Sequence, residues 1–172
     1  MQQFESIAVA SILRCETVES IGRFTIVWNL FEHHYMGNNA HEAGIYKLPL
    51  SFIDDIDTPE INTLIENYRT AVRHYFNVDY RDLNDEMISR VFYPSRKSGR
   101  YSSEIKDFFD YRNNSFKACL CSICRIRNNM LHGEKDVYSI NYQIDIIIAA
   151  TEILSYLVKD DTLDLLAKET EL

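Results

Sequence analysis

The scarcity of glycine and proline is the feature that most constrains the fold of this chain. Its 172 residues contain five Gly and three Pro, whereas sandwiches and barrels need turn residues at short, regular intervals. Hydrophobic residues make up 46% of the sequence, enough for a buried core and too many for a disordered chain. The length suits one domain. We therefore expect a single helical domain over residues 1–172.

The spacing of apolar residues predicts where the helices lie. Residues 4–20 and 23–35 read as two helices or as one continuous helix, and residues 36–50 read as loop. Thr58 and Pro59 form a helix start, with Thr as the cap and Pro at the first helical position. The helix that starts there is expected to run to about Phe76. Another is expected to begin at a Ser102 or Ser103 cap and to run into 108–112. Further helices are expected at 83–92, 116–132, 141–159 and 160–168.

These segments predict an all-α fold, an antiparallel bundle of four to five main helices. Residues 141–159 are apolar on most helical faces, which predicts a central position for that helix. No stretch has the ~20 uncharged apolar residues that span a bilayer. The chain has no basic segment before an apolar one at its start, and its four Cys lack the density of a disulfide scaffold. We expect a cytoplasmic protein without a membrane contact.

Charge is distributed unevenly along the chain. The net charge is −8, made up of −8 over residues 1–89, +6 over 90–135 and −6 over 136–172. A globally acidic protein binds nucleic acid poorly without specificity. A locally basic window can still form an anion site, because distant charges are screened within ~10 Å. A solvated basic face remains the alternative interpretation of this window.

A polar segment inside the basic window has the residues for RNA cleavage. In Arg125-Ile-Arg-Asn-Asn-Met-Leu-His-Gly, Arg127 can bind phosphate oxygens and His132 can transfer a proton near neutral pH. Two Asn in a helix interior are mildly unfavourable and ask for a reason. The spacing alone is weak, because Arg69 and His74 repeat it without a polar pair. We interpret that second copy as an ordinary helix surface.

One helix by itself makes a loose site. Arg127 and His132 are five residues apart, which places them about 140° apart around an ideal helix. Two copies packed about a two-fold axis bring the same patch together twice and make a tighter site. This geometry favours a homodimer.

The segment RNNMLHG, residues 127–133, resembles the Arg-polar-x-x-x-His signature of HEPN domains (higher eukaryotes and prokaryotes nucleotide-binding). Residues 23–35, in which Glu32 follows Trp28 by one turn, resemble the early helix of the Apea-like and abortive-infection branches. Residues 37–112 match nothing in the family and are expected to be an insertion of loops and short helices. Position 134 is Glu, so the chain lacks the His-x-Tyr extension of the toxin branch that pairs with nucleotidyltransferase antitoxins.

The resemblance implies a metal-independent endoribonuclease of four to five helices that acts as a homodimer. It implies that His132 is the general base or acid at the 2′-hydroxyl or the leaving 5′-oxygen, and that Arg127 binds the scissile phosphate. Asn128 is expected to position the phosphate or the His, and Glu32 to orient Arg127 or His132. The expected products carry a 2′,3′-cyclic phosphate and a 5′-hydroxyl. Trp28 is expected to pack in the core.

The implied setting is phage defence, a toxin or a stress response. The expected partners are RNA, a second copy of the chain and a regulatory or antitoxin protein, with no cofactor and no metal. Further RNA contacts are expected from the basic residues Arg125, Arg96, Lys97, Arg100 and Lys135, with Tyr93 and Tyr101 available for stacking. The alternative function is a non-catalytic HEPN-like module that binds nucleotide, RNA or protein, which the −8 charge also suits.

Two metal hypotheses carry less weight. Cys119, Cys121 and Cys124 diverge around a helix, so they are expected to be small core residues and not zinc ligands. His33, His34 and His41 flank a loop rich in Gly and Asn; they could bind a metal or face the cleft, but no ligand spacing orients them.

Overall fold

The structure is a computed structural model that describes residues 13–49, 58–78, 83–93, 101–131 and 137–159. Every regular element within these ranges is a helix, which confirms the all-α class. The helices are α2 (Cys15–Met36), α3 (Glu42–Ile45), α5 (Pro59–Tyr75), α6 (Asp85–Phe92), α7 (Ser102–Phe109), α8 (Phe116–Leu131), α9 (Val137–Ile140) and α10 (Ile144–Leu157). The helix expected at 160–168 and the first part of the helix expected at 4–20 lie outside the described residues.

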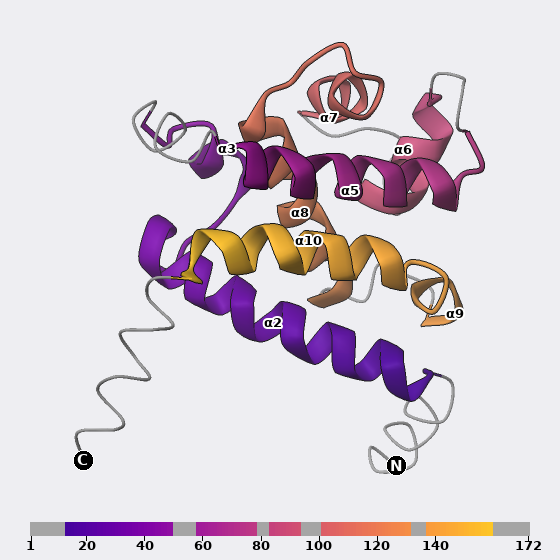
Figure 1. Cartoon of the computed structure of the whole chain (residues 1–172), viewed down its shortest axis with the longest axis horizontal. Helices are drawn as coiled ribbons and strands as arrows, with labels where there is room; N and C mark the ends of the chain where they lie inside the picture. The colour runs from indigo at the N-terminus through magenta and orange to yellow at the C-terminus, as the bar shows by residue number, and fades with distance from the viewer. Residues whose placement is uncertain (1–12, 50–57, 79–82, 94–100, 132–136, 160–172) are drawn as a thin grey trace.

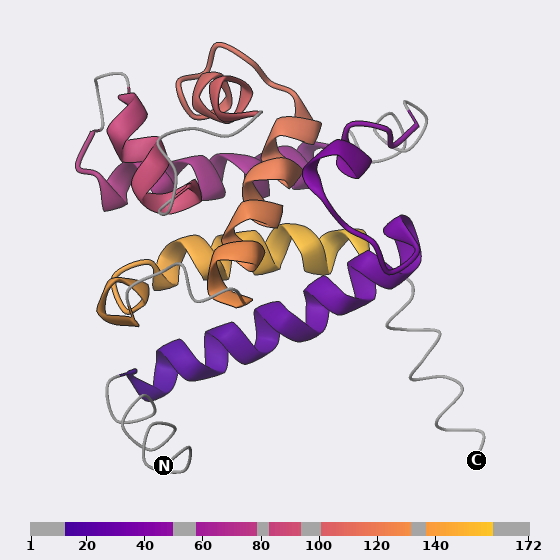
Figure 2. The ribbon, with the colours of Figure 1, turned by 180° about the vertical axis from the view of Figure 1, so that it is seen from behind.

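The helices form two layers that cross each other (Figure 1). In the first layer α10 lies between α2 and α5 and packs against both. In the second layer α8 packs against α3, α6 and α7, and Figure 2 shows it running steeply across the first layer. Most of the helix contacts lie within a layer, and α5 also contacts α7 of the second layer.

The two neighbours of α10 run in opposite directions. Thr17 at the start of α2 donates to Asn141 just before α10, and Tyr35 near the end of α2 donates to the Leu157 carbonyl at the end of α10. These helices are therefore parallel. Thr58, before α5, instead contacts Tyr156 near the end of α10 at 2.7 Å, so α5 is antiparallel to it. The expected antiparallel arrangement holds for α5 and not for α2, because the segment between α2 and α10 returns the chain to the end of the layer where α2 begins.

The most buried helix is α8, not the C-terminal helix that the apolar pattern favours. Residues 118–124 are consecutive and each is at most 1% exposed, which only a helix surrounded on all sides can achieve. By contrast α10 leaves Asp145, Ile148 and Glu152 facing solvent, with Ile148 42% exposed. Thus α10 is central within its own layer, between α2 and α5, as expected, but one of its faces is left to solvent.

Two predicted helix starts have different outcomes. Thr58 caps α5 by accepting the Ile61 amide at 3.3 Å, with Pro59 at the first position, as expected. The cap expected at Ser102 or Ser103 is wrong, because α7 is preceded by Tyr101 and has no side-chain cap. Residues 36–50 are not all loop, since Met36 ends α2 and α3 lies within them. Residues 15–36 confirm one continuous helix.

Residues 37–112 form part of the core. They supply Tyr68, Phe92 and Phe109, each fully buried, and the Tyr68 hydroxyl lies 2.9 Å from the Ser122 hydroxyl of α8. The protein therefore cannot bury α8 without this segment, whatever its origin. None of the helices in the described ranges is long and apolar enough to cross a bilayer.

The second Arg–His pair is not an ordinary surface. Arg69 is only 4% exposed, and its guanidinium donates to the Phe108 carbonyl, the Asn113 carbonyl and the Asn114 side chain. It holds the turn between α7 and α8 against α5. The surface interpretation of Arg69 is wrong, because a buried Arg is retained where several fixed carbonyls need donors. His74 is exposed, as expected.

Candidate functional site around Glu32 and Arg127

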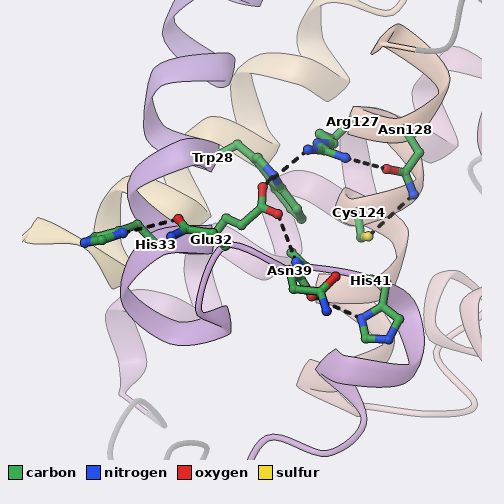
Figure 3. Close-up of polar contacts among 10 residues, drawn as sticks. Trp28, Glu32, His33, Asn39, His41, Cys124, Arg127 and Asn128 are labelled. Atoms are coloured by element: carbon green, nitrogen blue, oxygen red, sulfur yellow. Dashed lines mark hydrogen bonds and ion pairs between the residues drawn. The ribbon is translucent and has the colours of Figure 1, made fainter.

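The Glu32 carboxylate joins three parts of the chain. Its Oε2 accepts the Trp28 indole N–H at 2.8 Å and an Arg127 guanidinium N–H at 3.3 Å. Its Oε1 accepts the backbone N–H of Ala40 at 2.9 Å. Figure 3 shows these contacts meeting at the carboxylate. With 13% of its side chain exposed, Glu32 is a charge-assisted acceptor held on three sides.

The turn after α2 places the third donor. Gly37 and Asn38 both have left-handed backbones, with φ of 57° and 61°, and the Asn38 amide donates to the Glu32 carbonyl. These two residues reverse the chain, so that Ala40 returns to the side chain of Glu32. The Ala40 donor was missed because it is a backbone group. The Gly-Asn-Asn run at 37–39 was the sequence signal for this tight turn, since Gly and Asn adopt the left-handed backbone conformation at the lowest cost in free energy.

Arg127 leaves one donor without an acceptor. Its Nη2 contacts Glu32, its Nη1 donates to Asn128 Oδ1 at 3.0 Å, and the guanidinium carbon lies 5.7 Å from the centre of the Trp28 ring. The Nε–H is buried and has no partner among the described residues. Glu32 thus contacts Arg127 directly, and the orienting role expected for it stays a prediction. Trp28 is 1% exposed and packs in the core as expected, while its N–H also serves Glu32.

The two adjacent Asn residues do different things. Asn128 is half-buried, accepts from Arg127 and contacts Cys124 Sγ at 3.8 Å. Asn129 is fully buried and donates to the Val91 carbonyl of α6 at 2.9 Å. Asn129 therefore has a structural reason to interrupt the apolar helix: it satisfies a carbonyl at the end of α6. Only Asn128 faces the Glu32–Arg127 pair.

Arg125 has a structural partner set of its own. Its Nε donates to the Phe92 carbonyl at 2.9 Å, its Nη2 contacts Asn129 Oδ1 at 3.3 Å, and its guanidinium lies over the Tyr93 ring at 4.6 Å. The Tyr93 hydroxyl donates to Glu42 on α3. Arg125 thus joins α8 to the end of α6, and its contact with RNA stays a prediction.

Five of the predicted site residues lie outside the described residues. They are His132, Arg96, Lys97, Arg100 and Lys135. The structure therefore brings together Glu32, Arg127 and Asn128 of the four residues with a proposed catalytic role.

The cysteines of α8 are core residues, as expected. Cys119, Cys121 and Cys124 are fully buried, and burial raises the pKa of the Cys124 thiol to about 12. Burial also raises the pKa of the other two thiols well above the ordinary range. Within the described ranges no three His, Cys, Asp or Glu side chains are grouped so that they could hold a metal ion.

The histidines around the turn have separate neighbours. His33 contacts Asn38 Oδ1 at 3.2 Å, His34 packs edge-on against Tyr35, and His41 contacts the Asn39 carbonyl at 3.1 Å. His41 is the one that follows directly on Ala40. It is exposed, and Figure 3 shows it with Asn39 beside the Glu32 cluster.

Chemically, the cluster presents a guanidinium that is fixed by a carboxylate and an aromatic face. Such a group can bind an anionic oxygen without first being ordered.

Comparisons with protein-family models, with curated proteins and with solved structures found no match.

Proposed function

We propose that this protein is a metal-independent endoribonuclease of the HEPN type that acts as a homodimer in phage defence, as a toxin or in a stress response. In this proposal Arg127 binds the scissile phosphate, Asn128 helps to position it and Glu32 orients Arg127. His132 carries out one of the proton transfers. The 2′-hydroxyl attacks phosphorus, the bond to the 5′-oxygen breaks, and the products carry a 2′,3′-cyclic phosphate and a 5′-hydroxyl.

The observation that carries the proposal is the contact between Glu32 and Arg127. The two residues come from the two segments that resemble the family, 95 positions apart, and their side chains meet at 3.3 Å. The buried Nε–H of Arg127 has no acceptor within the part of the chain that the structure describes. An unmet donor costs about 1–3 kcal/mol when it is buried, and a bound anion that shifts the side chain can recover this free energy.

Cleavage of mixed RNA in excess EDTA tests the proposal. The wild type is compared with His132→Ala and Arg127→Ala, and the 3′ ends of the fragments are analysed. We expect cyclic-phosphate ends from the wild type alone. Both variants should give the circular dichroism spectrum of the folded wild type. Full cleavage by both variants, or no cleavage by the wild type, would contradict the proposal.

An exposed apolar face on α2 supports the proposed homodimer. Val18 and Ile26 are 49% and 63% exposed, and Gly22 lies between them with open space where a Cβ would be. A helix face of this kind lets a second backbone approach closely. Ile26→Asp should lower the dimer fraction in light scattering, while Asn62→Asp, at an exposed position of α5, should not.

The rival function is a binding module without catalysis. It is favoured by one observation: Arg127 already has an acidic partner, so it needs no ligand charge. The −8 net charge of the chain suits a protein partner better than bulk RNA. A module of this kind shows no cleavage at any protein concentration and retains a partner through purification.

A further inference from the structure

A pocket lies where the end of α5, α6, α9 and the start of α10 come together. Figure 1 shows these elements gathered at one end of the molecule. The pocket has a volume of about 550 Å³, which is within the usual range for small-molecule sites. None of the described residues that line it belongs to the Glu32–Arg127 cluster. The pocket is therefore separate from the site proposed for RNA.

Three helices each give the pocket one apolar and one polar side chain. The pairs are Ala71 and His74 on α5, Met87 and Arg90 on α6, and Ile146 and Asp145 on α10. The apolar member of each pair is buried or half-buried, whereas the polar member is exposed. The pocket thus has an apolar floor and a polar rim, and this combination of apolar lining with a few convergent polar groups is the usual construction of a ligand site.

Aromatic rings form another part of the pocket wall. Tyr75 and Phe76 come from the end of α5, and their rings meet edge-on with centres 4.8 Å apart. Tyr142, just before α10, is 69% exposed, the highest value among the large hydrophobic side chains in the described ranges. Its ring already attracts one cation, since the guanidinium carbon of Arg14 lies 5.8 Å from the ring centre. A ligand in the pocket would cover part of this exposed ring.

The charges on the rim favour a cationic ligand. Arg90 is paired with Glu86, one turn earlier on α6, so its positive charge is offset. The Asp145 carboxylate and the His74 ring have no polar partner in the part of the chain that the structure describes. When the His74 ring is neutral, the rim therefore has an excess of negative charge. Residues 136–172 also carry a net charge of −6, so a multiply charged anion is disfavoured here.

We propose that this pocket binds an organic cation, a protonated amine with an aromatic or aliphatic body. The ammonium group donates to the Asp145 carboxylate in a charge-assisted hydrogen bond and is attracted by the Tyr142 ring. The body of the amine packs on the apolar floor, which includes Met87 and Ile146. An unpartnered carboxylate, an exposed aromatic ring and an apolar floor in one pocket carry this proposal. It does not depend on the ribonuclease function.

Calorimetric titration of the full chain tests the charge of the ligand. The probes are phenethylamine, phenethyl alcohol and hydrocinnamate, which have similar shapes and carry a positive charge, no charge and a negative charge. We expect the amine to bind most tightly and the anion most weakly. Any other order of affinity, or no saturable binding of the amine, would overturn the proposal. RNA cleavage is not part of this measurement, so a failure of the ribonuclease proposal leaves the result unchanged.

Variants of Asp145 test whether the amine binds in this pocket. Asp145→Asn removes the charged acceptor, so the Kd of phenethylamine should rise at least about tenfold, whereas the Kd of phenethyl alcohol should stay the same. Glu152→Gln is the matched control, because Glu152 is an exposed acid of the same helix that does not line the pocket. Wild-type affinity of Asp145→Asn for the amine would contradict the assignment of the pocket.

Variants of Tyr142 test the contribution of the aromatic ring. Tyr142→Leu keeps an apolar side chain but removes the ring, so the amine should bind about two- to fivefold more weakly. Tyr142→Phe keeps the ring and should bind the amine like the wild type. Position 142 is exposed, and both variants should give the circular dichroism spectrum of the folded wild type. Equal amine affinities of the two variants would remove Tyr142 from the site.

Discussion

The guanidinium of Arg127 lies 3.3 Å from the carboxylate of Glu32, which precedes it by 95 residues. The contact joins α2 of the first layer to α8 of the second. Because Glu32 also accepts from Trp28 and Ala40, the pair is more than a surface ion pair, which is usually worth no more than about 1 kcal/mol.

Replacing Glu32 by Gln should lower both activity and stability. The amide can still accept from Trp28, but Arg127 loses its charged partner and its fixed position. A misplaced catalytic group costs about 100-fold in rate, whereas the lost charged hydrogen bond costs about 1.5–3 kcal/mol in free energy of unfolding. RNA cleavage and urea unfolding measure the two effects. Glu152→Gln, an exposed acid on α10, is the control and should change neither.

The two adjacent Asn residues should separate activity from stability. Asn129→Ala removes a buried donor from the Val91 carbonyl, so the free energy of unfolding should fall by about 1–3 kcal/mol. Asn128→Ala should change it by less than about 0.5 kcal/mol and still slow cleavage, because it loses the contact with Arg127. Equal unfolding curves for the two variants would contradict this division.

Arg69 should matter for folding and not for RNA. Arg69→Met leaves the Phe108 and Asn113 carbonyls without their buried donor. Hydrogen bonds to charged groups contribute about 1.5–3 kcal/mol each, so we expect a destabilisation of at least that size in thermal or urea unfolding. His74→Ala, five residues on and exposed, should unfold like the wild type. A stable Arg69→Met protein with lost cleavage would instead place this second Arg–His pair in a site.

The reactivity of the thiols should show which cysteines are buried in the core. At pH 8 one thiol per native chain, the exposed Cys15, should react rapidly with a disulfide reagent, and the others only after unfolding.

The free energy of unfolding should depend on pH in the alkaline range. Burial raises the folded-state pKa of Cys124 from 9.0 to about 12. Between these values the unfolded state loses its proton first, so stability should fall as the pH rises from 9 to 12. Stability that is flat over this range would contradict the burial of these thiols.

Local features of the sequence predicted most of the helices. Thr58 and Pro59 begin α5 as expected, and α8 covers the predicted segment up to residue 131. Such features depend on residues within one turn of each other, which is why they can be read without the fold. The choice of Ser102 or Ser103 as a cap was wrong because both already lie within α7, and Tyr101 stands at the cap position.

The site could be predicted only in part. Glu32 and Arg127 were identified by type and position, but the sequence contains two Arg–His pairs with the same spacing. The tertiary structure separates Arg127, whose buried Nε has no partner in the described ranges, from Arg69, whose side chain is almost fully buried against fixed acceptors. The division of labour between Asn128 and Asn129 likewise depends on which side of α8 meets α6.

Composition and short-range periodicity are enough to predict the helical class, several helix boundaries and the residues available for chemistry. Tertiary structure decided the parallel packing of α2 with α10, the central place of α8 and the return of Ala40 to Glu32. These features depend on which apolar faces bury each other across tens of residues, and that choice is made by packing in three dimensions. No local pattern in the sequence contains it.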